Sequence, residues 1–276
     1  MKRRCVLLID LIMLICLSAG LIYVLLWACS REQHTPQVYR RPMSTVSASS
    51  ATPTATELPL MDFTELQQQN PDVVGWVNIP GTSIDYPVMQ TTDNQFYLRH
   101  GLDREYDQLG LPFLDYECKL VESDQLILYG HNMGEDRTER FSPLQDYRDP
   151  EYYKQHPVIY FYTPEETVRY KVVAVFGLTA RVEDADYFAF NEWINFPDED
   201  ARQRYLEQIE QRAFYMAGDF AHEEETLLTL CTCTYEMPDA RLVVVARPMR
   251  ENESEQADPV TVNPEPLLPL RWPRNE

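Results

Sequence analysis

Apolar residues in this chain fall into two kinds of pattern. The first thirty residues contain one long apolar run, from Cys5 to Cys29, in which Asp10 is the only charged residue. Most of the other apolar positions lie in short runs rich in β-branched and aromatic residues, separated by polar or turn-forming stretches. Short runs of this composition predict β-strands, and their spacing is typical of a β-barrel or β-sandwich. We therefore expect a mainly β fold after the apolar N-terminus.

Seven strand-like runs follow a first helix and strand near the start of this region. Residues 61–79 predict a short helix and then a strand that enters a turn at Pro80 and Gly81. The later runs are SIDYPVMQ, LPFLDY, QLILYG, VIYFYT, VRYKVVAVFGLTA, TLLTLCTC and RLVVVARP.

Two segments between the strands favour helices. Residues 139–157 predict one or two short helical turns, and residues 199–217 carry Tyr205, Ile209 and Phe214 at roughly helical spacing. An apolar face of that kind usually packs against a core.

The apolar run at residues 5–29 has about the length that a helix needs to cross a bilayer. We interpret it as an uncleaved anchor, since a signal peptide would have a shorter apolar region and a small-residue cleavage site. Three basic residues precede the run, which predicts that residues 1–4 stay in the cytoplasm. The expected protein is a single-pass membrane protein with its folded domain outside the cell.

Composition divides the exported part of the chain into three segments. Residues 30–60 are rich in Ser, Thr, Pro and Ala, which predicts a flexible stalk. Residues 61–249 contain the strand-like runs and are expected to form the folded domain. Residues 250–276 are proline-rich and charged, so we expect a disordered tail there.

Charge and cysteine content narrow the possible functions. The formal net charge of −20 argues against nucleic acid as a partner, because phosphate binding needs a basic surface. Three of the six cysteines lie in the apolar run, which leaves Cys118, Cys231 and Cys233 outside it. An odd number cannot all pair in disulfides, so at least one thiol is expected to be free.

The segment TLCTCTYEMPDAR, residues 229–241, carries the first candidate chemistry. A strand ends at Cys233, a loop follows, and the next strand begins at Arg241, so the two residues are expected to face each other at a hairpin mouth. A guanidinium would favour the thiolate and could stabilise an oxyanion. Strand reasoning alone does not decide between Cys233 and Cys231, beyond favouring the residue at the mouth.

A thiol nucleophile needs a proton acceptor, and histidine titrates near neutral pH. Of the five histidines, His131 follows the strand-like run QLILYG, where a glycine lets its side chain project from the barrel rim. A histidine at a strand end is more often structural, but the cysteine segment makes His131 the leading candidate.

With these residues in view, the chain resembles the sortases, which are membrane-anchored cysteine transpeptidases of Gram-positive surfaces, and most closely class B. The resemblance rests on TLCTC at 229–233, Arg241 after it, and YGHNM at 129–133. Supporting matches are NPDVVGWVNIPGTSIDYPVMQ, DNQFYLRH and FYTPEETVRYKV.

The resemblance implies an eight-stranded β-barrel with inserted helices and a transpeptidation reaction. It implies that Cys233 attacks the Thr–Gly or Thr–Asn bond of a sorting signal and forms a thioester. His131 would then protonate the leaving amine, and Arg241 would position the signal and help to hold the oxyanion. An amine of a cell-wall precursor or of a pilin subunit would release the acyl group.

Further roles are implied for the substrate groove. Asn94 and Leu98 would line its wall, and the backbone around Thr232 would lie near the oxyanion; for Leu98, core packing is an equal alternative. Residues 182–217 would select between NPxTN-like and (S/N)PxTG-like signals. The resemblance implies no cofactor and no metal, and C-x-C with one histidine falls short of the usual zinc ligand sets.

Two positions depart from the class B pattern. Cys231 stands where serine is common; the favoured interpretation is a small buried residue, and the alternative is a redox partner of Cys233, although a disulfide between alternate strand residues would be strained. Thr234 and Tyr235 separate the cysteine from Glu236, so we predict no catalytic carboxylate there.

Two other functions use the same residues differently. An exported cysteine endopeptidase would hydrolyse its acyl-enzyme with water rather than transfer it to an amine. A membrane-tethered binding domain would retain the barrel without activity.

Overall fold

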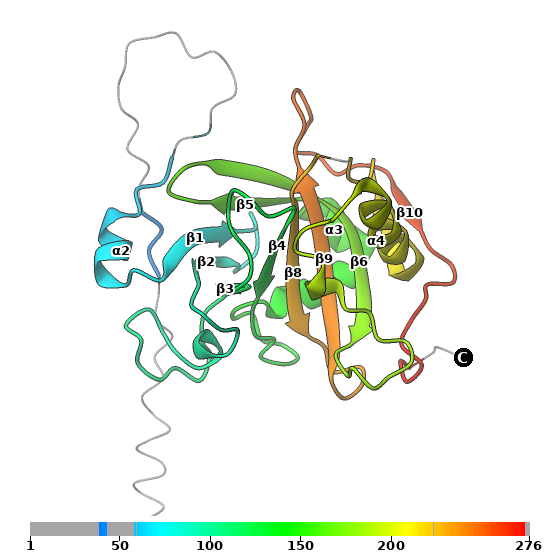
Figure 1. The fold of residues 1–276 in the computed structure, drawn as a ribbon, viewed down its shortest axis with the longest axis horizontal. Coiled ribbons are helices and arrows are strands. Elements are labelled where there is room, and N and C mark those ends of the chain that lie inside the picture. The colour runs from blue at the N-terminus through cyan, green and yellow to red at the C-terminus, as the bar shows by residue number, and fades with distance from the viewer. Residues whose placement is uncertain (1–38, 43–57, 59, 223, 274–276) are drawn as a thin grey trace, which may run out of the picture. The chain divides into compact units, whose positions relative to one another are not determined.

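Eight strands of the described chain pair edge to edge until the last joins the first, which closes a β-barrel (Figure 1). The computed structural model describes residues 39–42, 58, 60–222 and 224–273. Around the ring the order is β6-β5-β1-β2-β3-β4-β8-β9, and the β6–β9 pairing closes it. The predicted mainly β, eight-stranded barrel is confirmed.

The strands of the ring differ widely in length. Their bounds are β1 Val73–Asn78, β2 Asp85–Met89, β3 Phe113–Leu114, β4 Gln125–Tyr129, β5 Val158–Tyr162, β6 Thr167–Thr179, β8 Leu227–Cys233 and β9 Ala240–Pro248. Outside the ring, β7 (Ala213–Ala217) pairs with β6, and β10 (Val260–Val262) pairs with β7.

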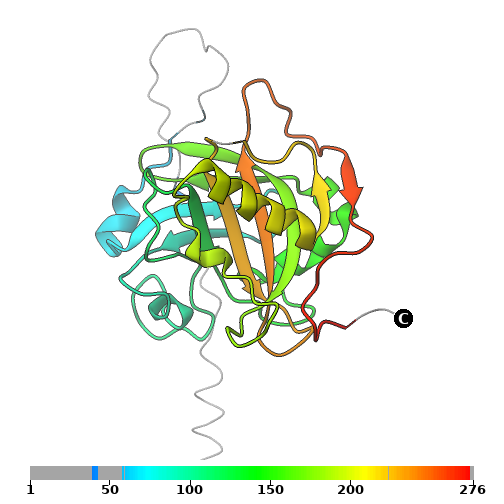
Figure 2. The same ribbon diagram turned by 45° about the vertical axis from the view of Figure 1, so that its right-hand side comes forward.

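Short helices connect the strands. They are α2 (Thr64–Gln69), α3 (Pro150–Gln155), α4 (Glu199–Arg212) and the 3-10 helices η1 (Phe96–Leu98), η2 (Ser142–Arg148) and η3 (Phe190–Glu192). Helix α4 begins where the Asp198 carboxylate accepts a hydrogen bond from the Ala201 amide at 2.7 Å, which caps its N-terminus. It packs against β6 and β7, and Figure 2 shows it lying across the barrel strands.

The predicted helices within residues 139–157 and 199–217 are found, but the second ends early. Residues 213–217 form β7 rather than a last helical turn. Their burial alternates, with Ala213, Tyr215 and Ala217 buried and the residues between them only partly so. A period of two fits a strand beside β6, and this packing overrides the helical spacing of the preceding residues.

Two strand pairings position the end of the barrel where the candidate residues lie. Strand β4 is parallel to β8, with Tyr129 opposite Cys231. Strand β9 is antiparallel to β8 on its other side, with Arg241 opposite Cys233. Most of β4, β8 and β9 is buried, as is usual for strands at the centre of a sheet.

Within the residues that the structure describes, no helix combines the length and the apolar character needed to cross a bilayer. The predicted cytoplasmic residues 1–4, the anchor at 5–29 and most of the stalk at 30–60 lie outside the described residues. From the predicted stalk, Arg41 contacts Asp85 of β2 at 2.8 Å.

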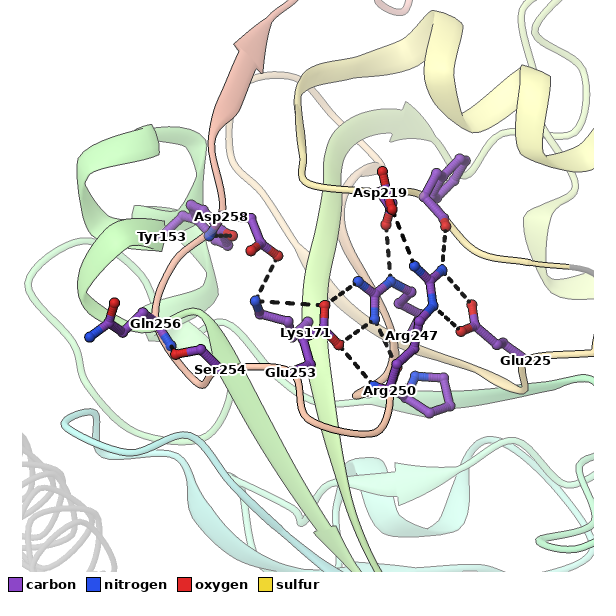
Figure 3. A network of polar contacts seen from close by, with 12 residues as sticks. Tyr153, Lys171, Asp219, Glu225, Arg247, Arg250, Glu253, Ser254, Gln256 and Asp258 are labelled. Carbon is purple, nitrogen blue, oxygen red and sulfur yellow. Dashed lines mark hydrogen bonds and ion pairs between the residues drawn. The ribbon is translucent and has the colours of Figure 1, made fainter.

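The prediction of a disordered tail after residue 249 is wrong for residues 250–273. These residues include β10, and they place carboxylates on two buried cations of the barrel (Figure 3). Glu253 binds Arg247 through both carboxylate oxygens, at 2.5 and 2.8 Å, and Asp258 lies 2.7 Å from Lys171 Nζ. Lys171 and Arg247 are each 1% exposed, so the tail supplies the charge that they require.

We expect Glu253→Gln to destabilise the folded chain by about 3 kcal/mol at neutral pH, because it removes a carboxylate from a buried cation. The hydrogen bonds from Arg247 lower the pKa of Glu253 to about 2, from about 4.3 in an unfolded chain. A lowered carboxyl pKa stabilises the fold above pH 4.3, and this contribution is lost as the pH falls toward 2. Urea unfolding at several pH values measures both effects.

The exposed Glu251 provides the matched control. Glu251→Gln should leave the unfolding midpoint within experimental error, and Glu253→Gln should lose less stability on acidification than the unsubstituted chain. Equal midpoints for the two variants at pH 7 would contradict an anchoring role for Glu253.

Candidate active site

The chain after β4 stays beside the end of β8. The β4–β8 register pairs Tyr129 with Cys231, and the next amide, of Gly130, donates to the Cys231 carbonyl at 3.2 Å. Two residues further on, the Asn132 side-chain amide donates to the Cys233 carbonyl at 3.0 Å, so the segment that carries His131 stays beside the end of β8. The predicted histidine and cysteine therefore come from neighbouring segments at one end of the barrel.

Cys233 is half-buried, and its thiol is free. Its carbonyl accepts hydrogen bonds from the Asn132 and Gln145 side-chain amides, each at 3.0 Å, which fixes the backbone at the end of β8. Arg241 stands opposite it in the register, as the hairpin interpretation predicts. The Arg241 guanidinium donates to the Ala240 carbonyl at 3.0 Å, and among the described residues it forms no ion pair.

The His131 ring is held by a backbone carbonyl. Its Nε2 lies 2.8 Å from the carbonyl oxygen of Leu98, and since a carbonyl can only accept, Nε2 carries a hydrogen in this arrangement. Burial lowers the pKa of His131, and the nearby Arg99 and Arg140 lower it further, while the Leu98 hydrogen bond opposes the shift. The imidazole is therefore mainly neutral at pH 7, with Nδ1 as its acceptor atom.

The two cysteines of TLCTC differ in their surroundings. Cys231 is 3% exposed, and burial raises the pKa of its thiol to about 12. Cys118 is also buried, and burial likewise raises its pKa to about 12. All three thiols are free in the structure. The burial of Cys231 agrees with the favoured interpretation of a small core residue.

The other predicted substrate residues make local hydrogen bonds. The Asn94 amide donates to the Asp115 carboxylate at 2.9 Å, and its oxygen accepts from the Tyr116 amide at 3.0 Å. The Thr232 side chain is buried, and its hydroxyl donates to the Gly130 carbonyl at 2.8 Å. These contacts give both residues structural roles, and their part in substrate binding stays a prediction. The side chain of Leu98 is half-buried.

A cavity of about 170 Å³ lies beside Cys231 and Arg241. Its other wall comes from the segment after β6, within the region predicted to select the sorting signal. We call it the Arg241 pocket, and its lining residues are Tyr129, Leu178, Ala180, Tyr187, Phe188, Phe190, Asn191, Cys231 and Arg241. A mostly apolar and aromatic lining with one guanidinium suits a peptide that presents apolar side chains and a carbonyl oxygen.

A larger, polar cavity of about 530 Å³ lies beside the loop that follows Cys233. Asn132, Gln145 and Tyr235 line it, and Glu236 and Arg148 face each other there as an ion pair. Glu236 is thus engaged with an arginine of η2.

Asn132 and Gln145 were not predicted as site residues, although they hold the Cys233 carbonyl. Asn132 follows His131 in YGHNM, so the motif itself offered a signal. Gln145 lies in η2, where nothing in the sequence distinguishes it. No three His, Cys, Asp or Glu side chains within the described ranges are arranged to hold a metal ion.

Comparison with known proteins decides the family. Residues 77–249, well over half of the chain, match the sequence model of the sortase domain. The chain belongs to the sortase family. This sortase is 30% identical over 176 residues to sortase B of Listeria monocytogenes, a match that covers 63% of this chain and 68% of the relative. It is 29% identical over 188 residues to sortase B of Staphylococcus aureus, covering 67% and 73%.

Solved structures give the same class. The sortase matches Clostridium perfringens sortase B with a TM-score of 0.62 and 26% identity, covering 68% of this chain and all of that one. It matches the Staphylococcus aureus sortase B–substrate complex with a TM-score of 0.62 and 27% identity, covering 69% and 85%. It is a cysteine transpeptidase of the sortase B type.

We expect iodoacetamide at pH 7.5 to alkylate Cys233 at least about tenfold faster than Cys231 or Cys118. Of these three described thiols, Cys233 is partly exposed, whereas Cys231 and Cys118 are buried and their pKa values are raised. Peptide mapping by mass spectrometry reports each thiol separately. In urea, all three should react at similar rates, which controls for peptide recovery. Equal labelling of Cys231 and Cys233 in the folded protein would contradict this assignment.

Proposed function

We propose that this sortase cleaves a C-terminal sorting signal after its threonine and transfers the new acyl group to an amine. The observation that carries the proposal is the register that pairs Cys233 with Arg241, together with the segment after β4, which carries His131 and contacts the end of β8. A thiol, an imidazole and a guanidinium are the groups that acyl transfer through a thioester requires.

The first half of the reaction forms the thioester. Cys233 Sγ attacks the threonine carbonyl carbon while its proton passes to the imidazole of His131, and the carbonyl oxygen gains negative charge. Arg241 donates hydrogen bonds to that oxygen. The intermediate then collapses, the C–N bond breaks, and the leaving amine takes the proton from His131.

The second half reverses these steps with a new amine. The acceptor amine attacks the thioester carbonyl, His131 takes a proton from it, and the C–S bond breaks to restore the Cys233 thiol. Because His131 is mainly neutral, its imidazole is available to accept a proton in both halves of the reaction.

The Arg241 pocket is proposed to receive the sorting signal. Its aromatic wall belongs to residues 182–217, and its guanidinium lies next to the nucleophile in the strand register. The structure of a Staphylococcus aureus sortase B–substrate complex supports substrate binding by this class. The signal is proposed to be NPxTN-like or (S/N)PxTG-like.

The acceptor is proposed to be an amine of a cell-wall precursor or of a pilin subunit. A sortase B has been solved in complex with triglycine, and this sortase matches that structure with a TM-score of 0.61 and 27% identity. The polar cavity beside Tyr235 is large enough for a short peptide of this kind. Residues 5–29 are proposed to anchor the protein in the cell membrane, with the catalytic domain outside.

Cys233→Ala should lower transpeptidation by at least about 10³-fold, since it removes the nucleophile, while Cys231→Ser should keep activity within about threefold of the unsubstituted protein. The assay incubates the full chain in detergent with a library of sorting-signal peptides, with and without triglycine. Formation of a ligated product supports transfer.

Hydrolysis alone in the presence of amine would indicate an endopeptidase, and failure of a thiol-reactive signal mimic to label Cys233 would indicate a silent binding domain. Loss of activity in both variants would require a larger role for Cys231.

Arg241→Gln should lower kcat/KM for the sorting-signal peptide by about 10² to 10³-fold, because it removes an oxyanion donor. Arg204→Gln, at an exposed position of α4, is the matched control and should change kcat/KM less than about twofold. Steady-state kinetics with triglycine in excess measures both. An unchanged kcat/KM in Arg241→Gln would remove Arg241 from the mechanism.

A further inference from the structure

The segment after residue 249 lies outside the part of the chain that matches the sortase domain model, yet it is ordered against that domain. We call residues 250–273 the C-terminal strap. In Figures 1 and 2 it runs from β10 down one side of the barrel to the end where the β8–β9 loop and the loop after β6 lie. Its contacts there connect it to the candidate site.

The root of the strap is fixed by charge. Figure 3 shows Glu253 bridging Arg247 and Lys171, with Asp258 on the other side of Lys171. Strand β10 then continues the sheet beyond β7. Ion pairs to two buried cations and a strand pairing give the strap one defined course along the barrel.

The tip of the strap is fixed by packing. Trp272 is 7% exposed and forms a small apolar cluster with Met237 of the β8–β9 loop and Ala240, the first residue of β9. Its indole also covers Gly177 of β6, where an added Cβ would lie only 2.4 Å from the ring. The indole therefore occupies the space that any side chain at position 177 would need.

Polar contacts at the tip hold the loop that follows β6. Arg271 Nη2 lies 2.6 Å from the Asp184 carboxylate, and the Leu270 amide donates to the Asp186 carboxylate at 2.6 Å. The Thr179 hydroxyl at the end of β6 donates to the same Asp184 carboxylate at 2.7 Å. Asp184 thus joins the strap, the end of the strand and the start of the loop.

Both segments held by the tip lead into the Arg241 pocket. Ala240, under the indole, directly precedes Arg241. The Asp184 carbonyl accepts a hydrogen bond from the Tyr187 amide at 3.0 Å, and Tyr187 and Phe188 form the facing wall of the pocket. The strap therefore contacts the base of each side of the pocket without lining it.

We propose that Trp272 and Arg271 are positioning residues for the donor substrate: they hold the Arg241 strand end and the Tyr187 wall at the spacing that accepts the sorting signal. This inference rests on the proposed function. The strap touches neither Cys233 nor His131 in the described contacts, so its effect is on binding of the signal rather than on the chemical steps or on the acceptor.

The test compares Trp272→Ala, Trp272→Phe and Arg271→Ala in the full chain in detergent, with Leu270→Ala as the matched control because that side chain is exposed. Trp272→Ala should raise KM for the sorting-signal peptide about tenfold, with kcat and the KM for triglycine changed less than about threefold. Trp272→Phe should recover part of the loss, Arg271→Ala should show a smaller rise, and Leu270→Ala none.

Hydrogen–deuterium exchange gives a readout that does not depend on activity. In Trp272→Ala, residues 180–191 and 234–241 should exchange faster, while the strands of the barrel keep their protection. If Trp272→Ala does not fold, Arg271→Ala, which removes only a partly exposed ion pair, serves for both measurements.

Two outcomes overturn the proposal. If Trp272→Ala lowers the melting temperature but leaves the peptide KM unchanged, the strap only stabilises the fold. If hydrogen exchange is unchanged in both loops, the strap does not position the walls of the pocket. If the unsubstituted protein forms no ligated product, the proposed function fails, and the exchange measurement still decides whether the strap positions the two loops.

Discussion

The parallel pairing of β4 with β8 is the constraint on which the rest of the site depends. It joins segments about a hundred residues apart; Cys233 is the last residue of β8, and His131 follows the last residue of β4 by two positions. Side chains alternate along a strand, so a slip of one residue would move the side chains of Cys231 and Cys233 to the opposite face of β8. Because both strands are buried, such a slip would expose apolar side chains and cost stability. The packing of the barrel therefore fixes the position of the candidate site residues.

Burial also separates residues of the same chemical type. Two cysteines on one face of one strand differ because β8 passes from the core at Cys231 to the barrel rim at Cys233. Partial burial of His131 likewise keeps its imidazole mainly neutral. Partial exposure is what distinguishes Cys233 as the proposed nucleophile, and Arg241, opposite it in the register, is the proposed donor to the developing oxyanion.

Local patterns predicted most of the barrel, and they predicted the Cys233–Arg241 pair because a hairpin is a short-range feature. The nearness of the segment after β4 to the end of β8 depends on a parallel register, which no local pattern encodes, and only the family resemblance linked His131 to this pair. Strand β7 was missed because five alternating residues directly follow a helix. The ordered C-terminus was missed because its stability comes from the pairing of its carboxylates with Lys171 and Arg247, whose burial the sequence does not reveal.

Gly177 and Trp272 together change where the domain should be considered to end. A chain shortened to the boundary of the family match would keep every residue with a chemical role in the proposed reaction. It would also leave an empty site above Gly177 and two cations in the barrel wall without their carboxylates. For expression or grafting of this enzyme, the foldable unit thus extends to residue 273, past the boundary at residue 249 that sequence similarity defines.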